Sequence, residues 1–169
     1  MHLRDSFIAL LCTVALASTA AAQTTYIGVL SGGTEVPPVA TPATGNASVV
    51  LNAAQTQLSI SVQFQNLIGT YSASHIHGPA AAGTNAGVKW GFSGAVSGWI
   101  FSNANHDGTI TNFIATGITP TDVANLNTGQ FYVNIHSTSF PGGELRAQLG
   151  QAPVPTAKST WSRVKSLYR

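Results

Sequence analysis

Hydrophobic and polar residues alternate along much of the chain between residues 26 and 149. In residues 58–64 (LSISVQF) every second residue is apolar, and serine or glutamine occupies the positions between. This period of two is typical of an antiparallel strand with one buried and one exposed face. Further short segments of this kind, separated by turn-forming residues, predict strands at 26–30, 47–51, 71–77, 88–92, 96–101, 110–115, 130–136 and 144–149.

One segment between these strands has helical features. Thr119 or Thr121 can cap a short helix that runs to Leu126, and Gly129 marks its end. Two adjacent prolines make residues 35–42 an extended loop or edge segment. Many short strands with one helix predict an all-β fold, an antiparallel Greek-key β-sandwich of the immunoglobulin-like or Cu,Zn-superoxide-dismutase-like type.

The N-terminal segment, residues 1–22, differs from the rest. Arg4 precedes an apolar run at 7–18, and small residues follow up to Ala22. This order predicts a signal peptide cleaved after Ala22, with an uncleaved membrane helix as the alternative. Cys12 is the single cysteine and lies in the apolar run. The mature chain, starting at Gln23, therefore has no thiol for a disulfide, a cysteine-ligated metal or a nucleophile.

Charge is scarce and unevenly placed. Only 7% of residues are charged, and residues 23–157 contain two basic and four acidic side chains. A body with two cations cannot neutralise several phosphates, so nucleic-acid binding is excluded. The four remaining cations of the mature chain lie in residues 158–169.

The C-terminal part divides into two segments. Residues 151–157 contain two prolines and predict a stiff linker after a domain at 23–150. Residues 158–169 predict a basic amphipathic tail, which either attaches the protein to the envelope or docks on the domain through Trp161.

Histidines form the one group with candidate chemistry. His75 and His77 are two apart in a predicted strand, so both side chains lie on one face. His136 ends another predicted strand, and if the two strands are neighbours the three imidazoles converge. Three nitrogen ligands suit copper or zinc. His106 lies in an Asn-His-Asp-Gly turn, and we interpret it as a solvated turn residue.

Polar residues near these histidines allow a second interpretation. Glu144 and Arg146 alternate onto one face and could form a surface ion pair or orient a histidine. Together with Asn134 they could instead join the histidines in a hydrogen-bond network that ties loops to the sheet, without a metal. We find no catalytic nucleophile, nucleophile elbow, phosphate loop or carboxylate pair, so we predict no enzymatic activity.

Four sequence blocks resemble a known family. They are residues 30–38 (LSGGTEVPP), 75–80 (HIHGPA), 132–136 (YVNIH) and 141–149 (PGGELRAQL). Together they are similar to the CHRD domain, which is found in repeats in animal chordin and as single secreted copies in bacteria. The resemblance implies a single-domain, secreted bacterial β-sandwich without an established catalytic role. It places the family's histidines on His75, His77 and His136 and its acidic and basic pair on Glu144 and Arg146. Ala147 stands where the family often has glycine.

Two functions are therefore expected. The first is a secreted or periplasmic, non-enzymatic binding or structural module of the cell envelope or extracellular matrix. Its partner would be an extracellular protein or polymer, bound through the loops at 78–87 and 137–143. The alternative is a copper- or zinc-binding protein that uses His75, His77 and His136. The His-x-His strand is also faintly similar to Cu,Zn superoxide dismutase, but too few ligands are present to carry that activity over.

Overall fold

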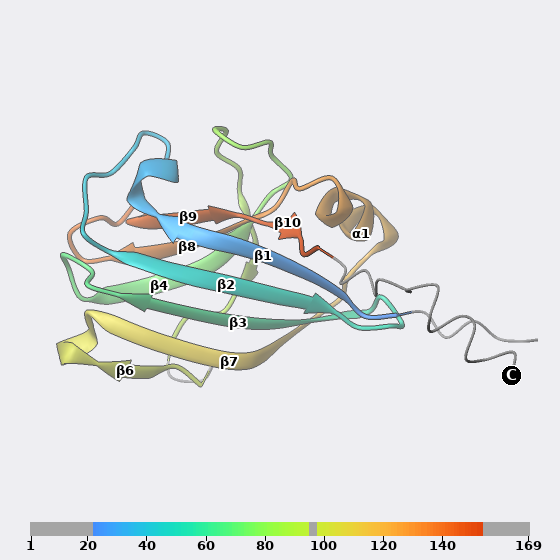
Figure 1. Ribbon diagram of the computed structural model, residues 1–169, viewed down its shortest axis with the longest axis horizontal. Coiled ribbons are helices and arrows are strands. Elements are labelled where there is room, and N and C mark those ends of the chain that lie inside the picture. Colours follow the sequence, from blue (N-terminus) through green and yellow to red (C-terminus); the bar gives the residue numbers. More distant parts are fainter. Residues whose placement is uncertain (1–21, 95–97, 154–169) are drawn as a thin grey trace, which may run out of the picture.

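The computed structural model describes residues 22–94 and 98–153, which form an antiparallel β-structure with one α-helix (Figure 1). Two short 3-10 helices, η1 (Gly32–Thr34) and η3 (Asn103–Asn105), lie at its loops. The strands are β1 (Thr24–Ser31), β2 (Thr44–Leu51), β3 (Gln57–Gln65), β4 (Tyr71–His77), β5 (Val88–Gly91), β6 (Ile100–Ser102), β7 (Asp107–Thr116), β8 (Tyr132–Ser137), β9 (Leu145–Gln148) and β10 (Gly150–Gln151).

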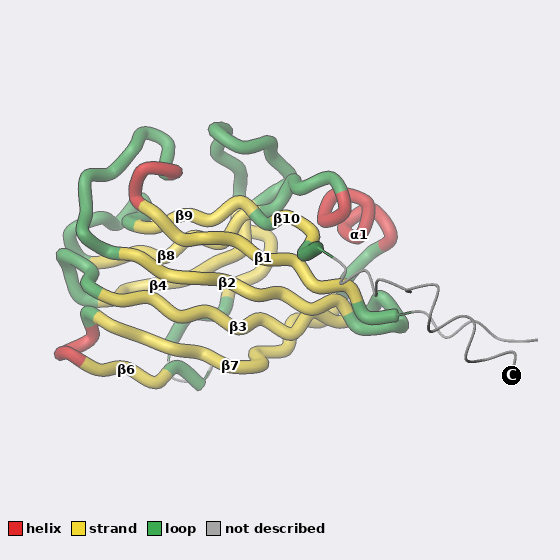
Figure 2. Tube along the Cα trace, viewed as in Figure 1, coloured by secondary structure: helices red, strands yellow, loops and turns green. Residues whose placement is uncertain are grey.

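All strands belong to one curled sheet. Its order is β5-β4-β8-β9-β1-β2-β3-β7-β6, and β10 pairs with β1. The two halves meet where Ser31 of β1 pairs with Arg146 of β9. Figure 2 shows β1, β2, β3, β7 and β6 in one layer, with β4 and β8 behind them. The sheet thus folds over itself as a sandwich, which confirms the predicted all-β antiparallel class with one short helix.

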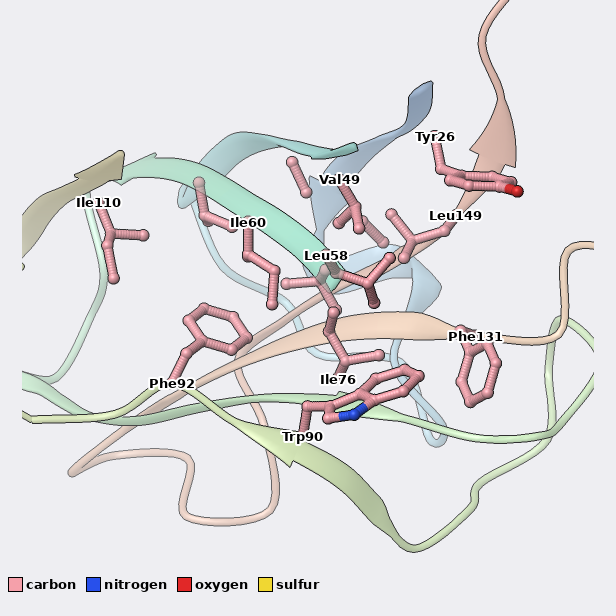
Figure 3. Close-up of a cluster of buried hydrophobic side chains, with 14 of the residues drawn as sticks. Tyr26, Val49, Leu58, Ile60, Ile76, Trp90, Phe92, Ile110, Phe131 and Leu149 are labelled. Atoms are coloured by element: carbon pink, nitrogen blue, oxygen red, sulfur yellow. The ribbon is translucent and has the colours of Figure 1, made fainter. Parts of the chain in front are cut away.

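The hydrophobic core lies between the two layers. Leu58, Ile60 and their alternate neighbours on β3 are buried, whereas the residues between them are partly or fully exposed. They face Ile76 of β4 and the rings of Trp90 and Phe92 from the other layer (Figure 3). The alternation of apolar and polar residues in the sequence of β3 therefore separates the side chains that enter the core from those that face the surface.

The helix α1 (Pro120–Asn127) starts at the predicted cap. Thr119 Oγ1 accepts a hydrogen bond from the Asp122 amide, and Asp122 Oδ2 accepts one from the Thr119 amide. Asp122 also forms an ion pair with Lys89 at 2.7 Å, which links the helix to β5. The sequence signal was sufficient here because a capping box is a local interaction.

Removing this cap should cost a modest amount of stability. We expect Thr119→Ala to lower the free energy of unfolding by about 1 kcal/mol, because the Asp122 amide loses its acceptor at the first turn. Thr121→Ala is the matched control, since Thr121 is exposed in the same turn; its effect should stay within about 0.5 kcal/mol. Urea denaturation of both variants measures the difference, and equal effects would contradict this role of Thr119.

The C-terminal boundary lies slightly later than the sequence suggests. Gln151, predicted as the first linker residue, pairs with Tyr26 in the sheet. The Ala152 amide then donates to the Thr25 carbonyl at 2.8 Å. The predicted signal peptide up to residue 21, the linker from residue 154 and the basic tail lie outside the described residues. Within the described part of the chain, no helix has the length and apolar character needed to cross a membrane.

Candidate metal site

Strands β4 and β8 are direct neighbours, and this pairing brings the three histidines together. His75 lies opposite Asn134 in the register, His77 opposite Tyr132, and His136 opposite Ala73. On the other face of both strands, Ile76, Val133 and Ile135 are completely buried in the core. The core-facing residues thus fix the imidazoles on the outer face of the sheet.

The three imidazoles form a close group. The ring centroids of His75 and His136 are 5.0 Å apart, those of His75 and His77 are 5.5 Å apart, and those of His77 and His136 are 6.2 Å apart. One ring nitrogen from each residue can be chosen so that all three lie within 4.8 Å of one another. The expected convergence of the histidines is therefore present in the structure.

Two of the rings are oriented by backbone carbonyls. His77 Nδ1 lies 3.0 Å from the Ala86 carbonyl oxygen, and His136 Nδ1 lies 2.9 Å from that of Pro141. A carbonyl oxygen only accepts, so each Nδ1 carries the proton and each Nε2 presents a lone pair. His77 Nε2 is buried and has no hydrogen-bond partner. A proton donated to a carbonyl in this way is the usual support of a metal-bound histidine.

His75 completes the group through its Nδ1 atom. This atom lies 3.1 Å from His136 Nε2, so in the metal-free protein His75 donates and His136 accepts. Two imidazole nitrogens bound to one zinc or copper ion at about 2.0–2.1 Å lie about 3.0–3.4 Å apart. A metal ion could thus replace the shared proton, while His75 carries its proton on Nε2. All three ligand atoms would then be neutral nitrogens.

Burial keeps these imidazoles uncharged. Burial, together with the nearby His136 and His77 rings, lowers the pKa of His75 to about 4. Burial also lowers the pKa values of His77 and His136, although hydrogen bonds to Ala86 and Pro141 partly offset the effect. Neutral imidazole is the form that binds a metal ion.

Arg146 is buried beside this group rather than paired at the surface. It is 1% exposed, and its guanidinium stacks 3.5 Å from the centroid of the Tyr132 ring, which itself stacks on His77. It donates to the Asn85 side chain and to the Thr84 carbonyl. Arg146 therefore ties the 78–87 loop to the sheet at Thr84 and Asn85.

Glu144 lies apart from the histidines. It is completely buried and accepts hydrogen bonds from the hydroxyls of Thr41 and Ser137 and from the Ile68 amide. Among the described residues, the one ion pair joins Lys89 to Asp122, so the predicted surface pair of Glu144 with Arg146 is wrong. Glu144 and Arg146 do point away from the core, as their alternation predicts. Loops cover this face, however, and each side chain bonds different loop residues.

His106 also lies outside the histidine group. Its Nδ1 lies 2.6 Å from the Leu67 carbonyl, and the Leu67 amide donates to the His106 carbonyl. His106 thus holds the loop after β3 in place. The prediction of a solvated turn residue is corrected accordingly.

Glu35 is a buried group that the residue pattern did not single out. It is 6% exposed, and Asn134 Nδ2 contacts its Oε2 at 3.4 Å. A Cβ atom on Gly143 would lie 2.6 Å from Glu35 Oε1 and 2.5 Å from Asn134 Oδ1, two oxygens without hydrogen-bond partners. Burial raises the pKa of Glu35 to about 7, although the charge of Arg146 opposes the shift. Asn134, expected to join the histidines in a hydrogen-bond network, contacts this carboxyl group.

The raised pKa of Glu35 predicts a pH-dependent stability difference. The folded protein holds the Glu35 proton more tightly than the unfolded chain does. The stabilisation that this provides is therefore fully present below pH 4.5 and is lost as the pH rises through 7. Glu35→Gln removes this titration while the histidines stay in both proteins. Between pH 5 and pH 8 we expect the unfolding free energy of Glu35→Gln to gain about 2 kcal/mol relative to wild type. Urea denaturation at both pH values measures this, and a constant difference would contradict it.

The described residues form an all-β antiparallel body with three converging imidazoles on its outer face. The CHRD domain family model matches residues 26–149, which is most of the chain, so the chain belongs to the CHRD domain family. Neither a curated protein nor a solved structure matches it.

Proposed function

We propose that the chain is a non-enzymatic binding module that acts outside the cytoplasm. Membership of the CHRD domain family is the observation that carries this proposal. The predicted signal peptide at 1–22 and the thiol-free mature chain support the location. The partner would be an extracellular protein or polymer, and the loops at 78–87 and 137–143 are the proposed contact surface.

Export is tested by expressing the full chain in a host with a secretory pathway and measuring the mass of the product. We expect a protein that begins at Gln23, recovered in the periplasm or the medium. A full-length product that stays in the cytoplasm would contradict the proposal. Replacing Ala20 and Ala22 with bulky residues provides a control, because it should block cleavage at this position.

A second candidate function is the binding of copper or zinc by His75, His77 and His136. The placement of three neutral imidazole nitrogens within 4.8 Å of one another favours it. Two of these rings already have the tautomer that ligation requires. Such a set of three protein nitrogens suits both metals, and copper(II) should bind more tightly than zinc(II) in the same site.

Titration of the mature chain with Zn(II) and Cu(II) in a calorimeter tests this function. We expect one ion per chain with a dissociation constant in the micromolar range or below. His106→Ala is the matched control, because His106 lies outside the group and its loss should leave affinity unchanged. If wild type binds neither ion, the metal function is ruled out and the binding-module proposal stands alone.

A further inference from the structure

We propose that a metal ion at the three histidines fixes the 78–87 and 137–143 loops in one arrangement, so that metal occupancy controls the surface they form. The inference rests on the metal-binding function proposed above. It concerns what the ion would do to the rest of the molecule, which metal binding alone does not imply.

Each loop is attached to the site through one imidazole. Ala86 of the first loop accepts from His77 Nδ1, and Pro141 of the second accepts from His136 Nδ1. With Nδ1 bonded to a carbonyl, Nε2 is the nitrogen of each ring left for the metal, and one nitrogen from each of the three rings lies within 4.8 Å of the others. Each ring is therefore a rigid link between the ion and one backbone carbonyl.

On the side of the proposed metal position, these two rings have few contacts. His77 Nε2 has no hydrogen-bond partner, so its ring is held by the Ala86 contact and by stacking on Tyr132. His136 Nε2 has one neutral contact, to His75 Nδ1. Coordination would fix both rings and make each Nδ1–H a stronger donor, because the ring then shares the positive charge of the ion. The carbonyls of both loops would be held more firmly as a result.

The loops have other anchors too, and the Tyr132 hydroxyl accepts from the Ala86 amide at 3.1 Å and also contacts the Ala86 carbonyl at 3.4 Å. Arg146 holds the first loop at Thr84 and Asn85, and Glu144 holds the start of the second loop through Ser137. The histidine links therefore act on the parts of the loops next to β5 and at Pro141. Since loops carry the binding residues of many modules, holding both loops more firmly would couple the contact surface to metal occupancy.

Hydrogen–deuterium exchange with and without one equivalent of Zn(II) tests this coupling on the mature chain. We expect exchange in peptides covering 78–87 and 137–143 to slow by about fivefold or more when zinc is bound. Peptides from β3 serve as the internal reference and should not change. Calorimetry on the same samples reports whether zinc is bound.

A variant separates the ion from the loop contacts. Among the described residues, His75 Nδ1 contacts His136 Nε2 and not a loop carbonyl. His75→Ala should therefore remove zinc-dependent slowing at the same zinc concentration, whereas His106→Ala should retain it. Bound zinc with unchanged exchange in both loops would overturn the inference and leave metal binding intact. Failure of zinc to bind would overturn both, and calorimetry distinguishes the two results.

Discussion

Replacing His136 with alanine is expected to weaken Zn(II) binding by about 100-fold or more. Changes to groups that merely support a metal ligand already cost about 10- to 100-fold in affinity, and this change removes a ligand itself. His136 is the one ligand from β8, with its centroid 5.0 Å from that of His75 and 6.2 Å from that of His77. Two nitrogens from one strand would remain. Calorimetric titration of the variant measures the loss.

The control for this prediction is chosen to exclude an effect on folding. His136 also anchors the second loop, because its Nδ1 donates a hydrogen bond to the Pro141 carbonyl. The variant should therefore first be shown to unfold cooperatively on heating. His106→Ala changes a histidine that also bonds a backbone carbonyl, that of Leu67, but lies outside the group. Retained zinc affinity in a folded His136→Ala protein, or equal losses in both variants, would contradict the proposed ligand set.

Replacing Glu144 with alanine is expected to lower the free energy of unfolding by about 4 kcal/mol. Three donors, from Thr41, Ile68 and Ser137, lose their acceptor at once, and Ser137 is completely buried. Each unsatisfied group costs about 1–3 kcal/mol, and partial relaxation keeps the sum below the upper limit. For a body of this size the midpoint of thermal unfolding should fall by about 10–20 °C. Thermal denaturation followed by circular dichroism measures it.

Glu144→Gln keeps the prediction testable if the alanine variant does not fold. The amide retains an oxygen for the Thr41 hydroxyl and the Ile68 amide, and its NH₂ group can donate to the Ser137 oxygen. We expect less than half the loss of the alanine variant. Zinc affinity of Glu144→Gln should stay within about threefold of wild type, because Glu144 does not contact the histidines. A stable Glu144→Ala protein would show that this network contributes little.

The sequence predicts the features that depend on local pattern. Alternation on β3 identifies which side chains enter the core, and the Thr119 cap identifies the start of α1. The His75 and His77 spacing places both rings on one face because side chains alternate along a strand. The CHRD resemblance is confirmed by the family match over residues 26–149.

The sequence does not predict which outward-facing residues loops cover. Arg146 and Glu144 occupy positions that face away from the core, where a surface ion pair is the usual outcome. Their burial depends on the paths of the 78–87 loop over Arg146 and of residues 41 and 68 over Glu144. Glu35 is buried for the same kind of reason. Contacts between segments about 60–110 residues apart leave no periodic signal in the chain.

A crystal structure of the mature chain loaded with one equivalent of Zn(II) tests the central claim most directly. The account predicts one zinc ion about 2.0–2.1 Å from His75 Nδ1, His77 Nε2 and His136 Nε2, with the bonds to Ala86 and Pro141 intact. A zinc ion bound elsewhere, or held by fewer than these three nitrogens, would contradict it.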